Sequence, residues 1–209
     1  PHLVGGHAGA AMALLDRFRT QPRQSHVDPV VRLAFVQEIP IDERELLTEI
    51  ALADPDGRVR RAAVAKLMDP AALARVVRGD ADESVRSAAA EMLRDIALEA
   101  FEDVTEADGL AAVEAVTDPR SLATVAKTSG REAIAASAVA RVTDAHALGS
   151  VARHSPLEPI RRMAFEALQD RDEIFGVAMN GEYRDTAVAA VDSFVERETL
   201  AQIAARAKN

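Results

Sequence analysis

Apolar residues return at spacings of three and four along most of the chain, and the pattern repeats about every 26 residues. In the segment 58–68, Val59, Ala63 and Leu67 fall on one face of a helix. The segment 70–77 repeats the same spacing immediately afterwards. Each repeat unit is therefore predicted to consist of two amphipathic helices joined by a tight turn.

An acidic residue stands between the two predicted helices of every unit. Successive members of this series are 27, 26, 23, 26, 26 and 26 residues apart. Two of them are followed by Pro, and an acidic side chain that accepts hydrogen bonds from the first free amides of a helix is favoured there. We therefore expect each acidic residue to cap the second helix of its unit. The series is Asp42, Asp69, Asp95, Asp118, Asp144, Asp170 and Glu196.

Two columns of apolar residues keep register with these acidic residues, and we predict that both are buried. Six residues before the acidic residue, every unit except the first has an alanine, which suits close helix packing. These are Ala63, Ala89, Ala112, Ala138, Ala164 and Ala190. Two residues before it, with a displacement of one place in the first unit, stand Ile39, Leu67, Leu93, Val116, Val142, Leu168 and Phe194.

A helix pair of this length buries only one face, so neighbouring units must stack to complete a core. The sequence therefore predicts an all-α fold, a right-handed α-solenoid of about seven short helical hairpins. The array should fill residues 28–209 as a single domain. Because the chain ends within a helical pattern that no Gly or Pro follows, we expect it to be a fragment of a longer protein.

The residues before the array are expected to have two parts. Residues 12–27 should form a capping helix and a linker, with Leu14, Leu15 and Phe18 on the apolar face of that helix. Residues 1–11 lack the charged start and long apolar middle of a signal peptide, and we expect them to be left over from the expression vector.

The segments "DPDGRVRRAA" and "DADESVRSAA", together with the alanine column, resemble HEAT repeats in their short bacterial form. The segments "LLDRFRTQP" and "DPVVRLAFVQEIPIDERELL" resemble the start of large bacterial proteins in which such repeats precede a long charged coiled coil. The resemblance implies a polar ladder of arginines between units, which should lapse at Ala135 and Ala187. The arginines to which it carries over are Arg32, Arg60, Arg86 and Arg161.

Composition narrows the classes of partner. With 34 acidic and 25 basic residues the net charge is −9, which argues against non-specific electrostatic binding to nucleic acid or to an anionic membrane. The chain has no Cys, so disulfides and thiolate metal sites are excluded. It also has no apolar run of about 18 residues, the length needed to cross a bilayer. We expect a cytoplasmic protein without a membrane partner.

A group of basic residues on the second helices is the candidate partner-binding site. Arg78, Lys127 and Arg153 each follow the buried pair of their helix, and Arg75 lies three residues before Arg78. In a HEAT-like solenoid these helices line the concave side, so the group could receive an acidic protein, another part of the parent chain or a phosphate. The alternative is a solvated surface with cations that interact favourably with helix ends.

The segment 95–118 contains eight acidic residues and no Lys or Arg, and the repeat spacing falls to 23 there. Glu99 takes the place that an apolar residue holds in other units. The segment is either a docking patch, a bend in the superhelix or a plain solvated face.

The sequence contains no recognisable catalytic motif, since there is no Gly-rich phosphate loop, nucleophile elbow or metalloprotease His-Glu pair. His146 and His154 are two helical turns apart, roughly 12 Å, which is too far to share one metal. HEAT-like lyases and DNA glycosylases fit poorly, because the chain has no Trp and a single Tyr, Tyr183. The sequence favours a non-catalytic protein-interaction scaffold without a cofactor. A nucleic-acid-associated module is the alternative, and a lyase-type enzyme is less favoured.

Overall fold

The computed structural model describes residues 22–207, and within that range every regular element is helical. The all-α prediction is confirmed. Leu14, Leu15 and Phe18 of the expected capping helix, and the segment 1–11, lie outside the described residues. The elements are η1, a 3-10 turn (Arg23–Ser25), and the α-helices α2 (Pro29–Glu38), α3 (Arg44–Ala53), α4 (Gly57–Val64), α5 (Pro70–Gly79), α6 (Glu83–Ala97), α7 (Glu106–Ala115), α8 (Pro119–Thr128), α9 (Glu132–Val139), α10 (Ala145–His154), α11 (Glu158–Ala167), α12 (Arg171–Asn180), α13 (Arg184–Asp192) and α14 (Arg197–Arg206).

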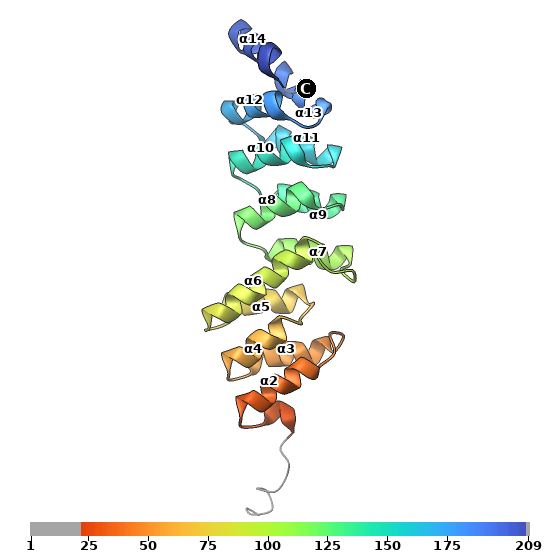
Figure 1. The fold of residues 1–209 in the computed structure, drawn as a ribbon, viewed down its shortest axis with the longest axis vertical. Coiled ribbons are helices and arrows are strands. Elements are labelled where there is room, and N and C mark those ends of the chain that lie inside the picture. The colour runs from red at the N-terminus through yellow and green to blue at the C-terminus, as the bar shows by residue number, and fades with distance from the viewer. Residues whose placement is uncertain (1–21, 208–209) are drawn as a thin grey trace, which may run out of the picture.

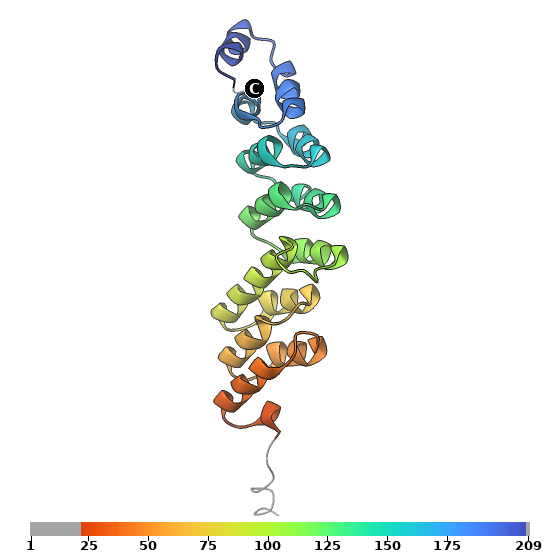
Figure 2. The same ribbon diagram turned by 45° about the vertical axis from the view of Figure 1, so that its right-hand side comes forward.

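The helices stack into one elongated column of two rows (Figures 1 and 2). The even-numbered helices α2 to α14 form one row, and the odd-numbered helices α3 to α13 form the other. Consecutive helices of a row pack on one another, but α12 and α14 touch only slightly and α6 and α8 hardly pack together. The closest pairs join the second helix of one predicted unit to the first helix of the next, as in α3 with α4 and α10 with α11.

The acidic residues cap helices at four of the seven predicted places. The carboxylates of Asp69, Asp118, Asp144 and Asp170 accept hydrogen bonds from amides in the first turns of α5, α8, α10 and α12. Glu196 precedes α14 without a side-chain capping bond, and α3 begins after Glu43 rather than after Asp42. These local bonds fix where most second helices start.

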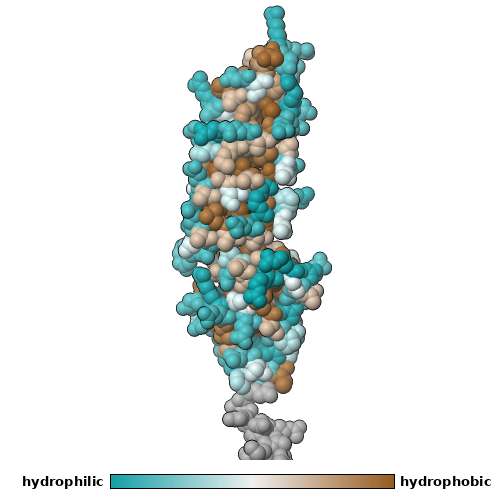
Figure 3. All heavy atoms as spheres, turned by 180° about the vertical axis from the view of Figure 1, so that it is seen from behind, coloured by the Kyte–Doolittle hydropathy of each residue, from teal (hydrophilic) through white to brown (hydrophobic). Residues whose placement is uncertain are grey.

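Both predicted apolar columns are buried. All six alanines have no exposed surface, and all seven larger apolar residues are buried beside them. Because an alanine side chain is small, helices can approach closely along this column, and one continuous apolar core follows the length of the stack. The opposite helix faces are mostly polar, and a vertical band of apolar and small side chains remains visible on the back of the molecule (Figure 3).

The third unit departs from the prediction, because Asp95 caps no helix. It lies inside α6, and its carboxylate accepts a hydrogen bond from Arg94. No turn residue precedes Asp95, and Ile rather than Pro follows it, so nothing interrupts the helix there. Ile96 and Ala97 are buried as a continuation of the same apolar face. The expected second helix of this unit is therefore absent, and its first turn has merged with α6.

The merger exchanges the two classes of helix between the rows. Before it, the first helices of the units (α2, α4 and α6) lie in the even row. After it, the first helices (α7, α9, α11 and α13) lie in the odd row, and the second helices (α8, α10, α12 and α14) lie in the even row. The 23-residue spacing thus marks a change in helix order as well as a shorter unit.

The predicted arginine ladder forms in the first three units. Arg32 donates to both carboxylate oxygens of Asp54, at 2.8 and 3.0 Å. Arg60 donates to the Asp54 backbone carbonyl at 2.8 Å and to the Asp80 carboxylate at 2.7 and 2.8 Å. Arg86 donates to the Asp80 carbonyl at 2.7 Å, so the chain of hydrogen bonds links α2, α4 and α6.

Arg161 forms a separate segment of the ladder near the carboxyl-terminal end. Its guanidinium donates to the Ser155 carbonyl at 3.0 Å and to the Asp185 carboxylate at 2.7 Å, and it lies 3.8 Å from the centre of the Tyr183 ring. Ala135, where the ladder should lapse, is fully buried. The continuous part of the ladder therefore runs from α2 to the merged helix α6 and does not extend beyond it.

Candidate functional site

The four predicted partner-binding residues do not form one column. Arg75 and Arg78 are exposed on α5, in the odd row, whereas Lys127 and Arg153 are half-buried on α8 and α10, in the even row. The merged unit causes this separation, because second helices lie in different rows before and after it. Within the described residues, Arg75, Arg78 and Lys127 have no ion-pair partner, but Arg153 does.

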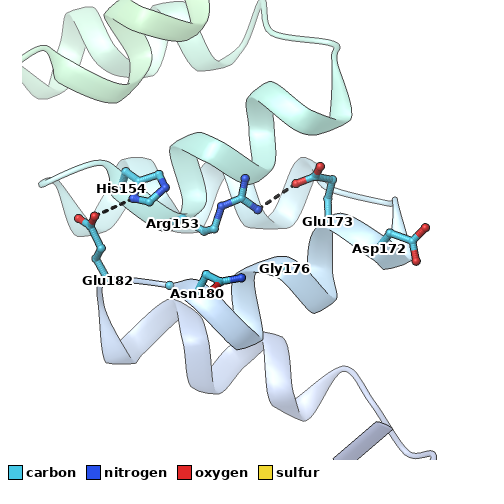
Figure 4. Close-up of a pocket in the computed structure, with 8 residues that line it drawn as sticks. Arg153, His154, Asp172, Glu173, Gly176, Asn180 and Glu182 are labelled. Atoms are coloured by element: carbon cyan, nitrogen blue, oxygen red, sulfur yellow. Dashed lines mark hydrogen bonds and ion pairs between the residues drawn. The ribbon is translucent and has the colours of Figure 1, made fainter. Parts of the chain in front are cut away.

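Arg153 lies in an open cleft of about 730 Å³ between α10 and α12 (Figure 4). Asp144 and Asp170 cap the two helices and so fix their starts. The cleft is predominantly polar, and its walls are supplied by adjacent helices of the even row. The lining residues are Arg153, His154, Asp172, Glu173, Gly176, Asn180, Gly181 and Glu182.

One ion pair and two histidine–carboxylate contacts join α10 to α12 and to the turn after it. Arg153 Nη1 lies 2.9 Å from Glu173 Oε2, and His146 Nδ1 lies 2.7 Å from Glu173 Oε1. His154 Nδ1 lies 2.9 Å from Glu182 Oε1. The dashed lines of Figure 4 mark the first and the last of these contacts. The two histidines therefore bind different carboxylates.

Two glycines make room for the Arg153–Glu173 pair. A Cβ atom at Gly149 would lie 2.3 Å from Glu173 Oε2, and one at Gly176 would lie 3.0 Å from Arg153 Nη1. Both glycines lie inside helices, where glycine costs about 1 kcal/mol relative to alanine. A helical glycine in each of two stacked helices is a sequence signal for this cleft that the predictions from the sequence did not use.

The charge of Arg153 is already compensated inside the cleft. Burial tends to raise the pKa of Glu173, but hydrogen bonds from His146 and Arg153 outweigh it, so the pKa of this carboxyl lies below its ordinary value. Glu173 is thus ionised at neutral pH, and an incoming anion would have to displace it from Arg153. Among the described residues, no group of three or more His, Asp or Glu side chains could hold a metal ion.

The turn between α6 and α7 has an unusual backbone conformation. Glu99 has φ 59°, and it is the one non-glycine residue with positive φ in the described range. The Ala100 amide donates to the Asp95 carbonyl at 3.0 Å, as in a Schellman helix end, where glycine normally takes the left-handed position.

The Glu99 carboxylate fastens this turn to the end of α8 and the start of α9. Ser129 Oγ donates to Glu99 Oε1 at 2.6 Å, and Arg131 Nε lies 3.2 Å from Glu99 Oε2. Arg131 also donates to the Val104 carbonyl at 2.9 Å. The side chain thus gives a physical reason for a glutamate in a position that favours glycine. We call these contacts of Glu99, Ser129 and Arg131 the α6–α9 latch.

Comparison with known proteins does not identify the chain: no family model, no curated protein and no solved structure matches it. Within the described residues, no helix is both long and apolar enough to cross a membrane.

Proposed function

We propose that the protein is a HEAT-like, right-handed α-solenoid that acts as a non-catalytic protein-interaction scaffold in the bacterial cytoplasm. Stacked helices in two rows, the buried alanine column and the arginine ladder support this reading. Stacked repeats of this kind present long surfaces built from successive units, and such surfaces suit extended partners.

The observation that carries the proposal is the placement of the open α10–α12 cleft on the surface of the stack. The α10–α12 cleft is lined by consecutive helices of one row, while the interior of the stack is filled by apolar side chains. A partner that lies along the stack contacts several helices at once. The partner is a protein or another part of the parent chain, and the exposed Arg75 and Arg78 on α5 are candidate contacts for its acidic side chains.

Charge reversal on the two rows tests this proposal. Three variants are compared with the unaltered chain as immobilised baits in bacterial lysate that keeps its nucleic acids: Arg75→Glu/Arg78→Glu, Lys127→Glu, and the control Arg61→Glu/Arg162→Glu. The control positions are exposed and have no ion-pair partner in the described structure. We expect a discrete protein to be retained by the unaltered chain and the control but lost from one row variant.

The ligand class is then read from purified components. A protein partner should bind with a modest dependence on salt, whereas a nucleic acid should lose affinity steeply as salt is added. If the captured material were nucleic acid, or if the chain converted a bound small molecule, the scaffold proposal would be wrong. Equal helicity of all variants by circular dichroism excludes unfolding as the cause of a loss.

A further inference from the structure

A second cleft, of about 630 Å³, lies beside the carboxyl-terminal half of α6. We call it the α4–α6 cleft. It is bordered by the turn after α2, the link after α4 and the turn after α6, which belong to three successive units. Its lining residues are Ile41, Asp42, Arg44, Ala65, Lys66, Met68, Met92, Ala100, Phe101, Glu102 and Asp103.

The merged unit creates this cleft. Aligned on the alanine column, α4 ends one residue after Ala63, whereas α6 continues for seven residues beyond the equivalent point. At 1.5 Å per residue, α6 projects about 10 Å further than α4. The projecting end and the following turn therefore form a wall beside the link after α4, and the α6–α9 latch holds that wall in place.

The floor of the cleft is apolar and adaptable. Met68, Met92 and Phe101 are half-buried and pack on the core from one side, and Ile41 is 57% exposed at the rim. Methionine is unbranched and polarisable, so it adjusts its shape to different apolar partners. The volume of the cleft, about 630 Å³, lies within the usual range for pockets that receive ligands, about 300–1,000 Å³.

The charge available at the rim is mainly negative. The Lys66 ammonium uses its hydrogen bonds within the protein, because it donates to the carbonyls of Val36, Gln37 and Ile39 at the end of α2. Asp42, Glu102 and Asp103 are exposed, and none has an ion-pair partner in the described residues. Arg44 is the remaining cation of the lining.

We propose that the α4–α6 cleft docks an amphipathic helix of a partner protein, with its apolar side chains on the methionine floor and its Lys or Arg residues against the acidic rim. The inference rests on the proposed scaffold function and names one of its surfaces. Within the described residues the cleft has no strand edge to pair with an extended peptide, whereas a helix satisfies its own backbone hydrogen bonds and can present one apolar face to the floor.

Methyl NMR of the full chain with ¹³C-labelled methionines tests the docking directly. The probe is an 18-residue designed helix with leucines on one face and lysines on the other. We expect the Met68 and Met92 methyl signals to shift on titration, while Met163 on α11 and Met179 on α12 stay in place. A peptide with glutamate in place of lysine should bind at least about tenfold more weakly, because it meets the acidic rim with like charge.

Two exposed apolar positions provide a matched pair of variants. Ile41→Lys should weaken peptide binding about tenfold, because it places on the apolar contact a charge of the same sign as the peptide, whereas Val188→Lys on α13, 48% exposed, should leave the affinity unchanged. Both variants should fold, since neither position is in the core.

Signals that shift at Met163 or Met179 instead, no binding at all, or equal binding of the glutamate peptide would overturn the α4–α6 site. None of these results would remove a partner that the charge-reversal experiment assigns to another face, so the two proposals can fail separately.

Discussion

At the scale of single residues, the alanine column sets the distance between stacked helices. Ala138 lies on α9 with no exposed surface, and the core around it is continuous. The larger side chain of a leucine would force neighbouring helices apart or into strained rotamers.

We therefore predict that Ala138→Leu lowers the free energy of unfolding by roughly 1 to 3 kcal/mol, measured by urea denaturation. Ala133→Leu on the same helix is the control, because Ala133 is exposed and the substitution should change stability little. Equal midpoints for both variants would contradict the role assigned to the column.

Glu99 offers a second test at this scale, because its left-handed backbone lowers the stability of the fold whereas the contacts of its side chain raise it. Glu99→Ala and Glu99→Gly both remove the carboxylate of the α6–α9 latch, but only glycine relieves the left-handed backbone. Glu99→Ala should therefore be less stable than Glu99→Gly by about 1 kcal/mol in urea denaturation. The reverse order would show that the positive φ carries no cost here.

At the scale of elements, the ladder and the cross-helix ion pairs make stability depend on pH. The hydrogen bond from Arg60 lowers the pKa of Asp80 and outweighs burial, and the pKa of Glu173 is also lowered. The half-buried Asp56 has its pKa lowered to about 2 by hydrogen bonds from Arg58. Because the unfolded chain binds protons more readily at these groups, their contribution is complete above about pH 5.

We predict that the free energy of unfolding falls as the pH drops from about 5 towards 2. Urea denaturation at pH 7, 5 and 3 measures this change. Asp80→Asn should give a shallower fall between pH 5 and pH 3, because it removes one group whose folded pKa is depressed. A slope unchanged by Asp80→Asn would mean that Asp80 does not contribute to the dependence.

Most elements were predictable because their signals are local. Asp69 and Asp118, each followed by Pro, announce helix starts through bonds to the next few residues, and the structure confirms them. Asp95 has the same place in the series but lacks a turn before it, so its sequence continues α6. The 23-residue spacing and the polar Glu99 indicate an irregularity at this point of the chain, but neither predicts that a helix is missing.

At the scale of the whole molecule, the loss of one helix rearranges every candidate surface. It separates Arg75 and Arg78 from Lys127 and Arg153, and it leaves α6 projecting beside the α4–α6 cleft. A repeat pattern assigns residues to helix faces but assigns helices to rows only if no element is skipped. The single basic column was therefore predicted from an alternation that the chain does not keep.

Cross-linking of engineered cysteine pairs tests this exchange of rows most directly, since the chain contains no cysteine. Arg78 and Glu114 follow the buried pairs of α5 and α7, which pack as row neighbours with axes about 8–10 Å apart. A short bismaleimide should link Arg78→Cys/Glu114→Cys efficiently and Arg78→Cys/Lys127→Cys poorly. Efficient linking of the second pair, with failure of the first, would restore the regular alternation and contradict the exchange.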